Sequence, residues 1–311
     1  MATGRFAGMS IVGLILLVVA CAKDVQQKAN TSAADSASTA AVTYPLPRNA
    51  GWDAPTAGMF VLLSAADDMI SAALVLPEET DSSLTKTLAP DAIPFANTSV
   101  DLFNTTGLAG TSTLAVNPQA QPAEGCLIWP SVRLTSKPGK EWRVGFTAGK
   151  ALAIPIHPIE KLDSSDSSSN AIELARLASE ATATNGDPAF LGLPFTVRKA
   201  YQLSIGDTVV LVGNVVRKIN EEANPREEHL LLVAERLGPT GKYILAFQNR
   251  SAGAEDAIRT NAVLAAVRFV RTKQAAIVLS FEYDDGGQLA LLERVASHDW
   301  QISWRSAYTG C

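Results

Sequence analysis

A mainly β, antiparallel fold is predicted by three features of this 311-residue chain. Short apolar and β-branched runs alternate with turn residues from Met59 to the C-terminus. A segment near the C-terminus repeats one that precedes it, and a single stretch has helical periodicity. These features favour antiparallel β-meander repeats, arranged as an irregular small propeller or as a β-sandwich, with one helix inserted near residues 170–183.

The strands are predicted from runs such as "TVVLVGNVVRKI", "LLLVAERL" and "AAIVLSFEY", whose lengths and residue types suit strands. Two turn signals separate such runs. "KPGK" at Lys137–Lys140 and "DDGG" at Asp284–Gly287 are expected to close hairpins, because Pro and Gly supply the backbone angles that turns need.

The helix is predicted from apolar residues that fall on one face between residues 170 and 183. Asn170 and Glu173 have the spacing of a capping box, and Gly186 follows the expected end. The tract Asp163–Ser169 is then a polar loop leading into the helix. It lacks the regular ligand spacing of a calcium loop.

The internal repeat aligns Leu230–Gly253 with Gln288–Gly310, with one gap in the turn. The matched residues are Glu235, Arg236, Tyr243 and Phe247 in the first copy and Glu293, Arg294, Trp300 and Trp304 in the second. A weaker third trace places Trp142 and Phe146 at the same aromatic spacing. Since residues four apart on a strand share a face, each aromatic pair is expected to be buried together. The duplicated Glu–Arg pairs suit structural ion pairs.

Composition sets the class of protein. Hydrophobic residues make up 47% of the chain, which is ample for a core, and the formal net charge is −5. A mildly acidic chain without a basic stripe argues against nucleic acid as a partner.

The N-terminus has the parts of a secretory signal. Arg5 supplies a positive charge, an apolar run follows from Phe6, and Ala20 places a small residue before Cys21. The run is shorter than the roughly 20 apolar residues of a spanning helix, and Lys23 bars its extension.

The stretch "VVAC", Val18–Cys21, resembles the lipobox of bacterial lipoproteins, in which the chain is cleaved before the cysteine and that cysteine carries the lipid. The resemblance covers only the first 21 residues. It implies membrane lipid as a partner through acylated Cys21, and a cell-envelope location, outer membrane facing the periplasm or the cell surface. The expected organisation is a signal peptide (1–20), a lipidated cysteine with a flexible tether (21–47) and a β-rich domain (48–311) with repeats at about 195–253 and 263–310.

Two cysteines remain once Cys21 is assigned to lipid. In an oxidising compartment Cys126 and Cys311 are expected to form a disulfide, and two unpaired thiols are the alternative.

Signatures of catalysis and cofactor binding are sparse. The histidines His157, His229 and His298 stand in no recognisable spacing and are expected at exposed or loop-end positions. The chain has no G-x-S-x-G, H-E-x-x-H, paired C-x-x-C or P-loop motif. We therefore expect no catalytic residues, no metal and no cofactor.

Acidic residues in two segments support an alternative function. Glu222 and Glu228 in "NEEANPREEH" and Asp285 in "YDDGG" could serve an envelope hydrolase acting on glycans or peptides, because glycoside hydrolysis uses paired carboxyl groups. The competing interpretation is solvated acidic hairpin tips that discourage edge pairing. Of the five tryptophans, three or four are expected in the core, and Trp52 is the candidate for ligand stacking.

The sequence thus favours a membrane-tethered envelope lipoprotein that acts as a non-enzymatic binding, scaffold or accessory module. Its expected partner is an envelope protein or a glycan.

Overall fold

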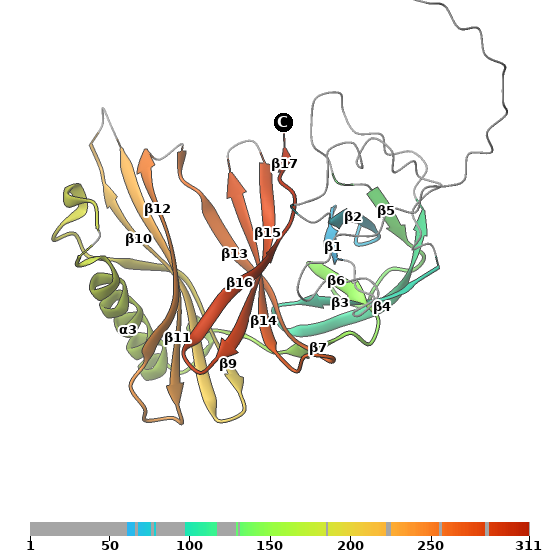
Figure 1. Cartoon of the computed structure of the whole chain (residues 1–311), viewed down its shortest axis with the longest axis horizontal. Coiled ribbons are helices and arrows are strands. Elements are labelled where there is room, and N and C mark those ends of the chain that lie inside the picture. Colours follow the sequence, from blue (N-terminus) through green and yellow to red (C-terminus); the bar gives the residue numbers. More distant parts are fainter. Residues whose placement is uncertain are drawn as a thin grey trace, which may run out of the picture. The chain divides into compact units, whose positions relative to one another are not determined.

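Antiparallel strands dominate the part of the chain that the computed structural model describes (Figure 1). That part comprises residues 61–65, 68–75, 78, 97–116, 129, 131–184, 186–221, 225–254, 257–283 and 286–310, all within the unit Pro45–Cys311. The mainly β prediction with antiparallel meanders and one α-helix is therefore confirmed for these residues.

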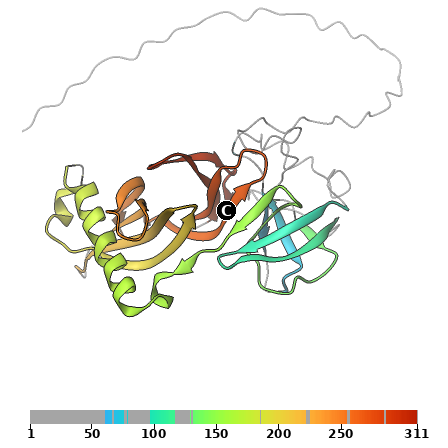
Figure 2. The same ribbon diagram turned by 90° about the horizontal axis from the view of Figure 1, so that it is seen from below.

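A closed six-stranded barrel forms the N-terminal part of the described chain (Figure 2). Its strands are β1 (Val61–Ser64), β2 (Ser71–Val75), β3 (Ser99–Asn104), β4 (Gly107–Val116), β5 (Ser131–Leu134) and β6 (Val144–Thr147). They follow the order β1-β2-β5-β4-β3-β6, and β6 pairs back to β1. The barrel encloses its own core, in which Leu62, Leu102 and Trp142 are fully buried. The sequence did not predict this closure.

Two antiparallel sheets follow the barrel in the chain. The first, here called sheet I, contains β8 (His157–Pro158), β9 (Thr196–Ile205), β10 (Thr208–Ile219), β11 (Arg226–Leu237) and β12 (Ile244–Ala254). The second, sheet II, contains β7 (Ala151–Ile154), β13 (Thr260–Phe269), β14 (Ala275–Tyr283), β15 (Gly286–Ala296), β16 (Asp299–Arg305) and β17 (Thr309–Gly310). Each is built on a four-stranded meander, β9 to β12 in sheet I and β13 to β16 in sheet II.

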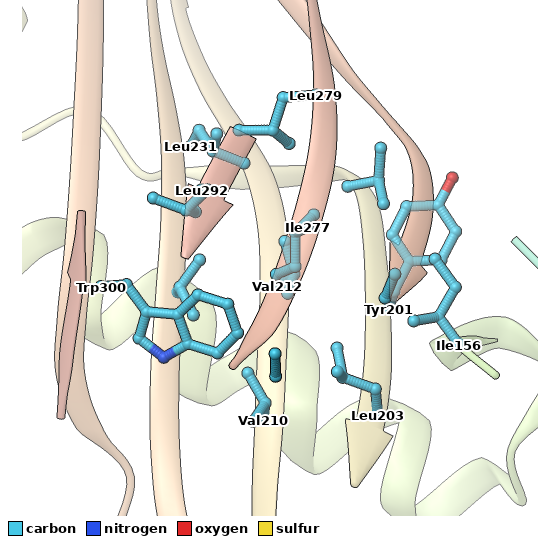
Figure 3. Packing of buried hydrophobic residues seen from close by; sticks show 14 of the residues in the cluster. Ile156, Tyr201, Leu203, Val210, Val212, Leu231, Ile277, Leu279, Leu292 and Trp300 are labelled. Atoms are coloured by element: carbon cyan, nitrogen blue, oxygen red, sulfur yellow. The ribbon is translucent and has the colours of Figure 1, made fainter. Parts of the chain in front are cut away.

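The two sheets pack face to face as a sandwich, which decides between the two predicted arrangements for this part of the chain. Apolar side chains from both sheets meet in the sandwich interior (Figure 3), where Val212 and Leu231 of sheet I pack with Ile277 and Leu279 of sheet II. Trp300 of sheet II belongs to the same cluster.

The outer faces of both sheets are also covered. The helix α3 (Ser164–Thr182) lies against sheet I (Figure 1). Its side chains Leu174, Leu177 and Ala178 pack on that sheet. Barrel residues such as Phe103 and Phe146 pack on the outer face of sheet II. Strands buried on both faces favour apolar residues at successive positions, which explains the uninterrupted apolar runs at residues 230–234 of β11 and 275–279 of β14.

The helix begins six residues earlier than predicted. Asp163 is its N-cap and accepts a hydrogen bond from the backbone N–H of Asp166 at 3.0 Å, so the Ser-rich tract forms the first turns rather than a loop. The predicted capping box at Asn170 is wrong. Asn170 is buried mid-helix and donates to Gln202 Oε1 while accepting from the Tyr243 hydroxyl. Two short 3-10 helices, η2 (Ile159–Lys161) and η3 (Pro188–Phe190), flank α3.

The predicted burial of each aromatic pair on one face is wrong. Trp142 lies in the barrel core and precedes β6, whereas Phe146 of β6 packs against sheet II. In the two copies of the repeat, a β-bulge separates the two members of the pair. The register of β12 against β11 shifts at Ala246, and that of β16 against β15 shifts at Ser303. An extra residue reverses the alternation of side chains beyond it. Trp300 therefore lies in the sandwich interior and Trp304 on the opposite face, against the barrel.

The two copies of the repeat stack in the same sense rather than back to back. In the first copy Val233 lies in the sandwich interior and Ala234 faces α3. Their matches in the second copy, Leu291 and Leu292, face the barrel and the sandwich interior respectively. The face that points to α3 in sheet I thus corresponds to the face of sheet II that points into the sandwich.

One of the two predicted hairpins is present. Tyr283 pairs with Gly286 across β14 and β15, so the strands flanking "DDGG" form a hairpin, whereas Asp284 and Asp285 lie outside the described residues. "KPGK" is not a hairpin turn. It lies in the connection from β5 to β6, and these two strands are separated in the barrel by β4 and β3.

Candidate functional site

A polar pocket of about 230 Å³ lies between the two sheets and is lined by residues of both. We call it the mouth pocket. It is lined by Arg198, Lys199, Asn214, His229, Thr260, Asn261, Ala262 and Glu282.

On the interior-facing side of β10 and β13, polar residues that line the mouth pocket follow the apolar residues of the sandwich core. On β10, Val210 and Val212 lie in the interior, and the next residue on that face is Asn214. On β13, Val263 is preceded on the same face by Asn261. The strands therefore keep their alternation while the side chains change from apolar to polar, which turns the end of the core into a hydrophilic recess.

Two asparagines join the sheets across this recess. Asn214 Nδ2 donates to the backbone carbonyl of Asn261 at 2.9 Å, which fixes the Asn214 amide with its oxygen directed elsewhere. The Oδ1 atoms of Asn214 and Asn261 are both buried and accept no hydrogen bond within the described protein. A buried acceptor without a partner costs about 1–3 kcal/mol, and folded proteins contain few of them.

Arg198 and Lys199 both line the pocket because β9 has a bulge where it pairs with β10. Lys199 pairs with Asn214, but Val197 pairs with the next residue of β10, which leaves Arg198 as the extra residue of β9. Neighbours on a regular strand point to opposite faces, and the bulge instead lets both side chains line one pocket. Both are exposed, and neither forms an ion pair with any other described residue.

His229 is buried on β11, only 7% exposed, so its predicted exposed or loop-end position is wrong. Its Nε2 is hydrogen-bonded to Glu227, which also accepts from Lys218. Burial would raise the pKa of Glu227, but the hydrogen bonds from Lys218 and His229 outweigh it and the pKa lies below its ordinary value. The other two histidines agree with expectation: His157 is exposed on β8 and His298 lies in the β15–β16 turn.

Glu228 is enclosed on the other face of β11. Arg217 donates to one of its carboxylate oxygens and Arg250 to the other, and Glu228 is 0% exposed. Arg217 in turn lies 4.5 Å from the ring centroid of Phe195. The interpretation of Glu227 and Glu228 as solvated hairpin-tip residues is therefore wrong. Glu228 is also inaccessible to a substrate, which removes it as an acid or base for the hydrolase alternative.

The duplicated Glu–Arg pairs form one ion pair, and it joins the two copies. Glu235 of β11 accepts two hydrogen bonds from Arg294 of β15, at 2.6 and 2.9 Å. It also accepts from Trp300 Nε1 at 2.6 Å and from the backbone N–H of His298 at 2.9 Å. Burial would raise the pKa of Glu235, yet these donors hold it below its ordinary value.

The two remaining residues of the duplicated pairs are Glu293 in the second copy and Arg236 in the first, and they do not form a second pair of this kind. Glu293 is 6% exposed and forms no ion pair among the described residues, and burial raises its pKa. Arg236 instead lies 4.6 Å from the ring centroid of Tyr243, and its Nε is buried without a hydrogen-bond partner. The stacking explains the difference. The face of sheet I that carries Glu235 meets sheet II, whereas the corresponding face of sheet II meets the barrel.

Several residues singled out by the sequence lie outside the described part of the chain. They are Cys21, Trp52, Cys126, Glu222, Asp285 and Cys311. The four tryptophans that the structure describes are all buried, as expected for the core: Trp129, Trp142, Trp300 and Trp304.

The mouth pocket itself was not predicted from the sequence. Its lining residues lie on five strands, β9, β10, β11, β13 and β14, and are therefore far apart in the sequence. A usable signal was present in "GNV" and "TNAV", where asparagine interrupts a β-branched run at a position that alternation assigns to the interior.

Within the described ranges, no group of three or more His, Cys, Asp or Glu side chains could hold a metal ion. No helix in the same ranges is long and apolar enough to cross a membrane. Comparison with family models, curated proteins and solved structures finds no match to this chain.

Proposed function

We propose that this protein is a membrane-tethered lipoprotein of the cell envelope that acts as a non-enzymatic binding module, with the mouth pocket as its binding site. The observation that carries the proposal is the convergence of two cations, one carboxylate and several neutral polar side chains around a recess of about 230 Å³. A pocket with convergent polar groups is the usual form of a small-molecule site.

The anchor half of the proposal is supported by the order of Arg5, the apolar run and Cys21. Acyl chains on Cys21 would contribute about 0.8 kcal/mol for each buried CH₂, and more than one chain makes anchoring stable. The outer membrane, on its periplasmic side or at the cell surface, is the proposed location.

The anchor is tested by expressing the full chain and its Cys21→Ser variant in a two-membrane bacterium that is fed radiolabelled palmitate. The parent should carry the label and sediment with membranes after a high-salt wash, and Cys21→Ser should do neither. A Cys21→Ser protein that is still labelled and still membrane-bound would remove the lipid anchor from the proposal.

The binding half is tested with a panel of small polar solutes: neutral sugars, sugar acids, amino acids and hydroxy acids. Ligand-observed NMR on the full chain should detect at least one solute that binds the parent and loses binding in Asn261→Ala. The matched control is Asn249→Ala, because Asn249 lies on β12 outside the pocket lining. If no solute binds, or if Asn261→Ala binds as the parent does, the mouth pocket is not the site.

A further inference from the structure

The mouth pocket has an uneven distribution of charge and of hydrogen-bonding groups. Arg198 and Lys199 bring two positive charges to it and Glu282 brings one negative charge. The lining therefore has an excess of positive charge without counting His229, whose ring is engaged by Glu227. A ligand that complements this lining carries a negative charge.

The uncharged and acidic side chains of the lining specify a second property of the ligand. Thr260, Asn261 and Glu282 offer a hydroxyl, an amide and a carboxylate group, all of which are matched by hydroxyl groups. Waters that fill such a recess can be displaced without loss only by ligand groups that reproduce their hydrogen bonds. Several hydroxyl groups on a rigid ring meet this requirement, whereas an apolar ligand does not.

The size of the pocket limits the ligand to one small unit. Its volume of about 230 Å³ lies below the roughly 300–1,000 Å³ of pockets that enclose drug-sized molecules. A single monosaccharide or a similar unit is the scale that remains. Its charged end would face Arg198 and Lys199, and its hydroxyl groups would face Thr260, Asn261 and Glu282.

We propose that the ligand of the mouth pocket is a carboxylated monosaccharide unit, held by Arg198 and Lys199 at its carboxylate and by the polar side chains of Thr260, Asn261 and Glu282 at its hydroxyl groups. This inference rests on the proposed binding function of the same pocket. The carboxylate can be bidentate to the Arg198 guanidinium, with Lys199 as a second charge. Both cations are exposed, so the interaction weakens as salt is added.

The unit has two possible sources, a free sugar acid or the terminal residue of a glycan. The shared chemistry is the carboxylate next to a ring of hydroxyl groups. The two sources differ at the anomeric carbon, which is free in the first and substituted in the second.

The test measures binding of sodium D-glucuronate to the full chain by titration calorimetry, with D-glucose as the neutral match and L-alanine as a zwitterion. Glucuronate should bind at least roughly tenfold more tightly than either. Methyl glucuronide, in which the anomeric carbon is substituted, then separates the sources: equal affinity assigns a glycan terminus, and loss of affinity assigns the free acid.

Two double variants accompany this test, and each removes two positive charges, one inside the pocket and the other outside it. Arg198→Gln/Lys199→Gln should weaken glucuronate binding at least roughly tenfold. The control Lys140→Gln/Arg271→Gln removes two exposed cations outside the pocket and should leave affinity unchanged. Both double variants change exposed side chains, and far-UV circular dichroism verifies that each is folded.

The inference is overturned if glucose binds as tightly as glucuronate, or if the pocket variant and its control bind glucuronate equally. Its failure is distinguishable from failure of the proposed function. If glucuronate does not bind but another solute of the panel binds and is lost in Asn261→Ala, the pocket remains the site and only the ligand class is wrong.

Discussion

Glu235 and Glu293 occupy equivalent positions of the repeat, and the structure predicts opposite effects when each is changed to glutamine. Glutamine keeps the size of the side chain and removes its charge. Glu235 is surrounded by donors, whereas Glu293 is buried and forms no ion pair with any residue that the structure describes. Both variants make the same Glu→Gln change, so a difference in their stability reports on the surroundings of the two side chains.

The magnitude for Glu235→Gln follows from its four hydrogen bonds. The amide oxygen of glutamine can keep Arg294 Nε and Trp300 Nε1, which share Oε1 in the parent. The amide NH₂ would then face Arg294 Nη2 and the backbone N–H of His298, so that donors meet donors. Groups left unpaired in a buried site cost about 1–3 kcal/mol each, and breaking a buried ion pair costs about 3–5 kcal/mol. Because Arg294 is partly exposed, we expect a loss of about 3 kcal/mol in the free energy of unfolding at neutral pH.

Glu293→Gln should raise the free energy of unfolding at neutral pH. Burial raises the pKa of Glu293 in the folded protein above its ordinary value of 4.5, so the unfolded chain loses this proton at lower pH than the folded chain does. Stability of the parent then falls as the pH rises from 4.5 through the folded pKa. Glutamine has no proton to lose, so the advantage of the variant is absent at low pH, grows over that window and is constant above it.

The pH dependence of Glu235 has the opposite sign. Its folded pKa lies below the ordinary value of 4.5, so its contribution is fully present above 4.5 and is lost as the pH falls through the folded pKa. The difference between the parent and Glu235→Gln should therefore shrink in acid.

Urea denaturation followed by far-UV circular dichroism, at a series of pH values from about 3 to about 8, measures all three proteins. The reasoning is refuted if the two variants lose the same stability at neutral pH. It is also refuted if Glu293→Gln loses stability relative to the parent as the pH rises.

Two further predictions concern the packing and capping of α3. Gly213→Ala should lower the free energy of unfolding by about 1–3 kcal/mol, because a Cβ at this position would lie 2.5 Å from Leu174 Cδ1 in a filled core. The control is Gly139→Ala, whose Cβ would meet nothing within 4 Å. Urea denaturation should show the control within about 0.5 kcal/mol of the parent. Asp163→Ala removes the cap on the Asp166 N–H and should cost about 1 kcal/mol, with faster hydrogen exchange in the first turn of α3 as the local readout; unchanged exchange would show that the cap contributes nothing.

The strands and the repeat could be predicted because their signals are local. Runs such as "LLLVA" must be apolar at every position if both faces are covered, and the structure covers both. The aromatic pairs show the limit of such reasoning. One extra residue at Ser303 places Trp300 and Trp304 on opposite faces, and neither composition nor spacing marks that residue as a bulge.

The barrel and the mouth pocket could not be predicted because they depend on pairings between distant segments. β5 inserts between β2 and β4, and no local pattern states this order. The pocket brings Lys199 of β9 to Asn261 of β13, and it also needs a bulge that aligns Arg198 with its neighbour. The N-terminal segment could be interpreted only by its resemblance to a lipobox, since Cys21 lies outside the described residues.

The same-sense stacking of the two copies has a further consequence for assembly. Contacts of this kind are heterologous: the face that one copy presents differs from the face that receives it, so a stack has two unlike ends and nothing in the contact itself limits its growth. In this protein α3 covers one end and the barrel covers the other, and among the described residues neither Arg236 nor Glu293 forms an ion pair there. The helix and the barrel thus cover two unlike ends of the stack, as the terminal units of a repeat array do.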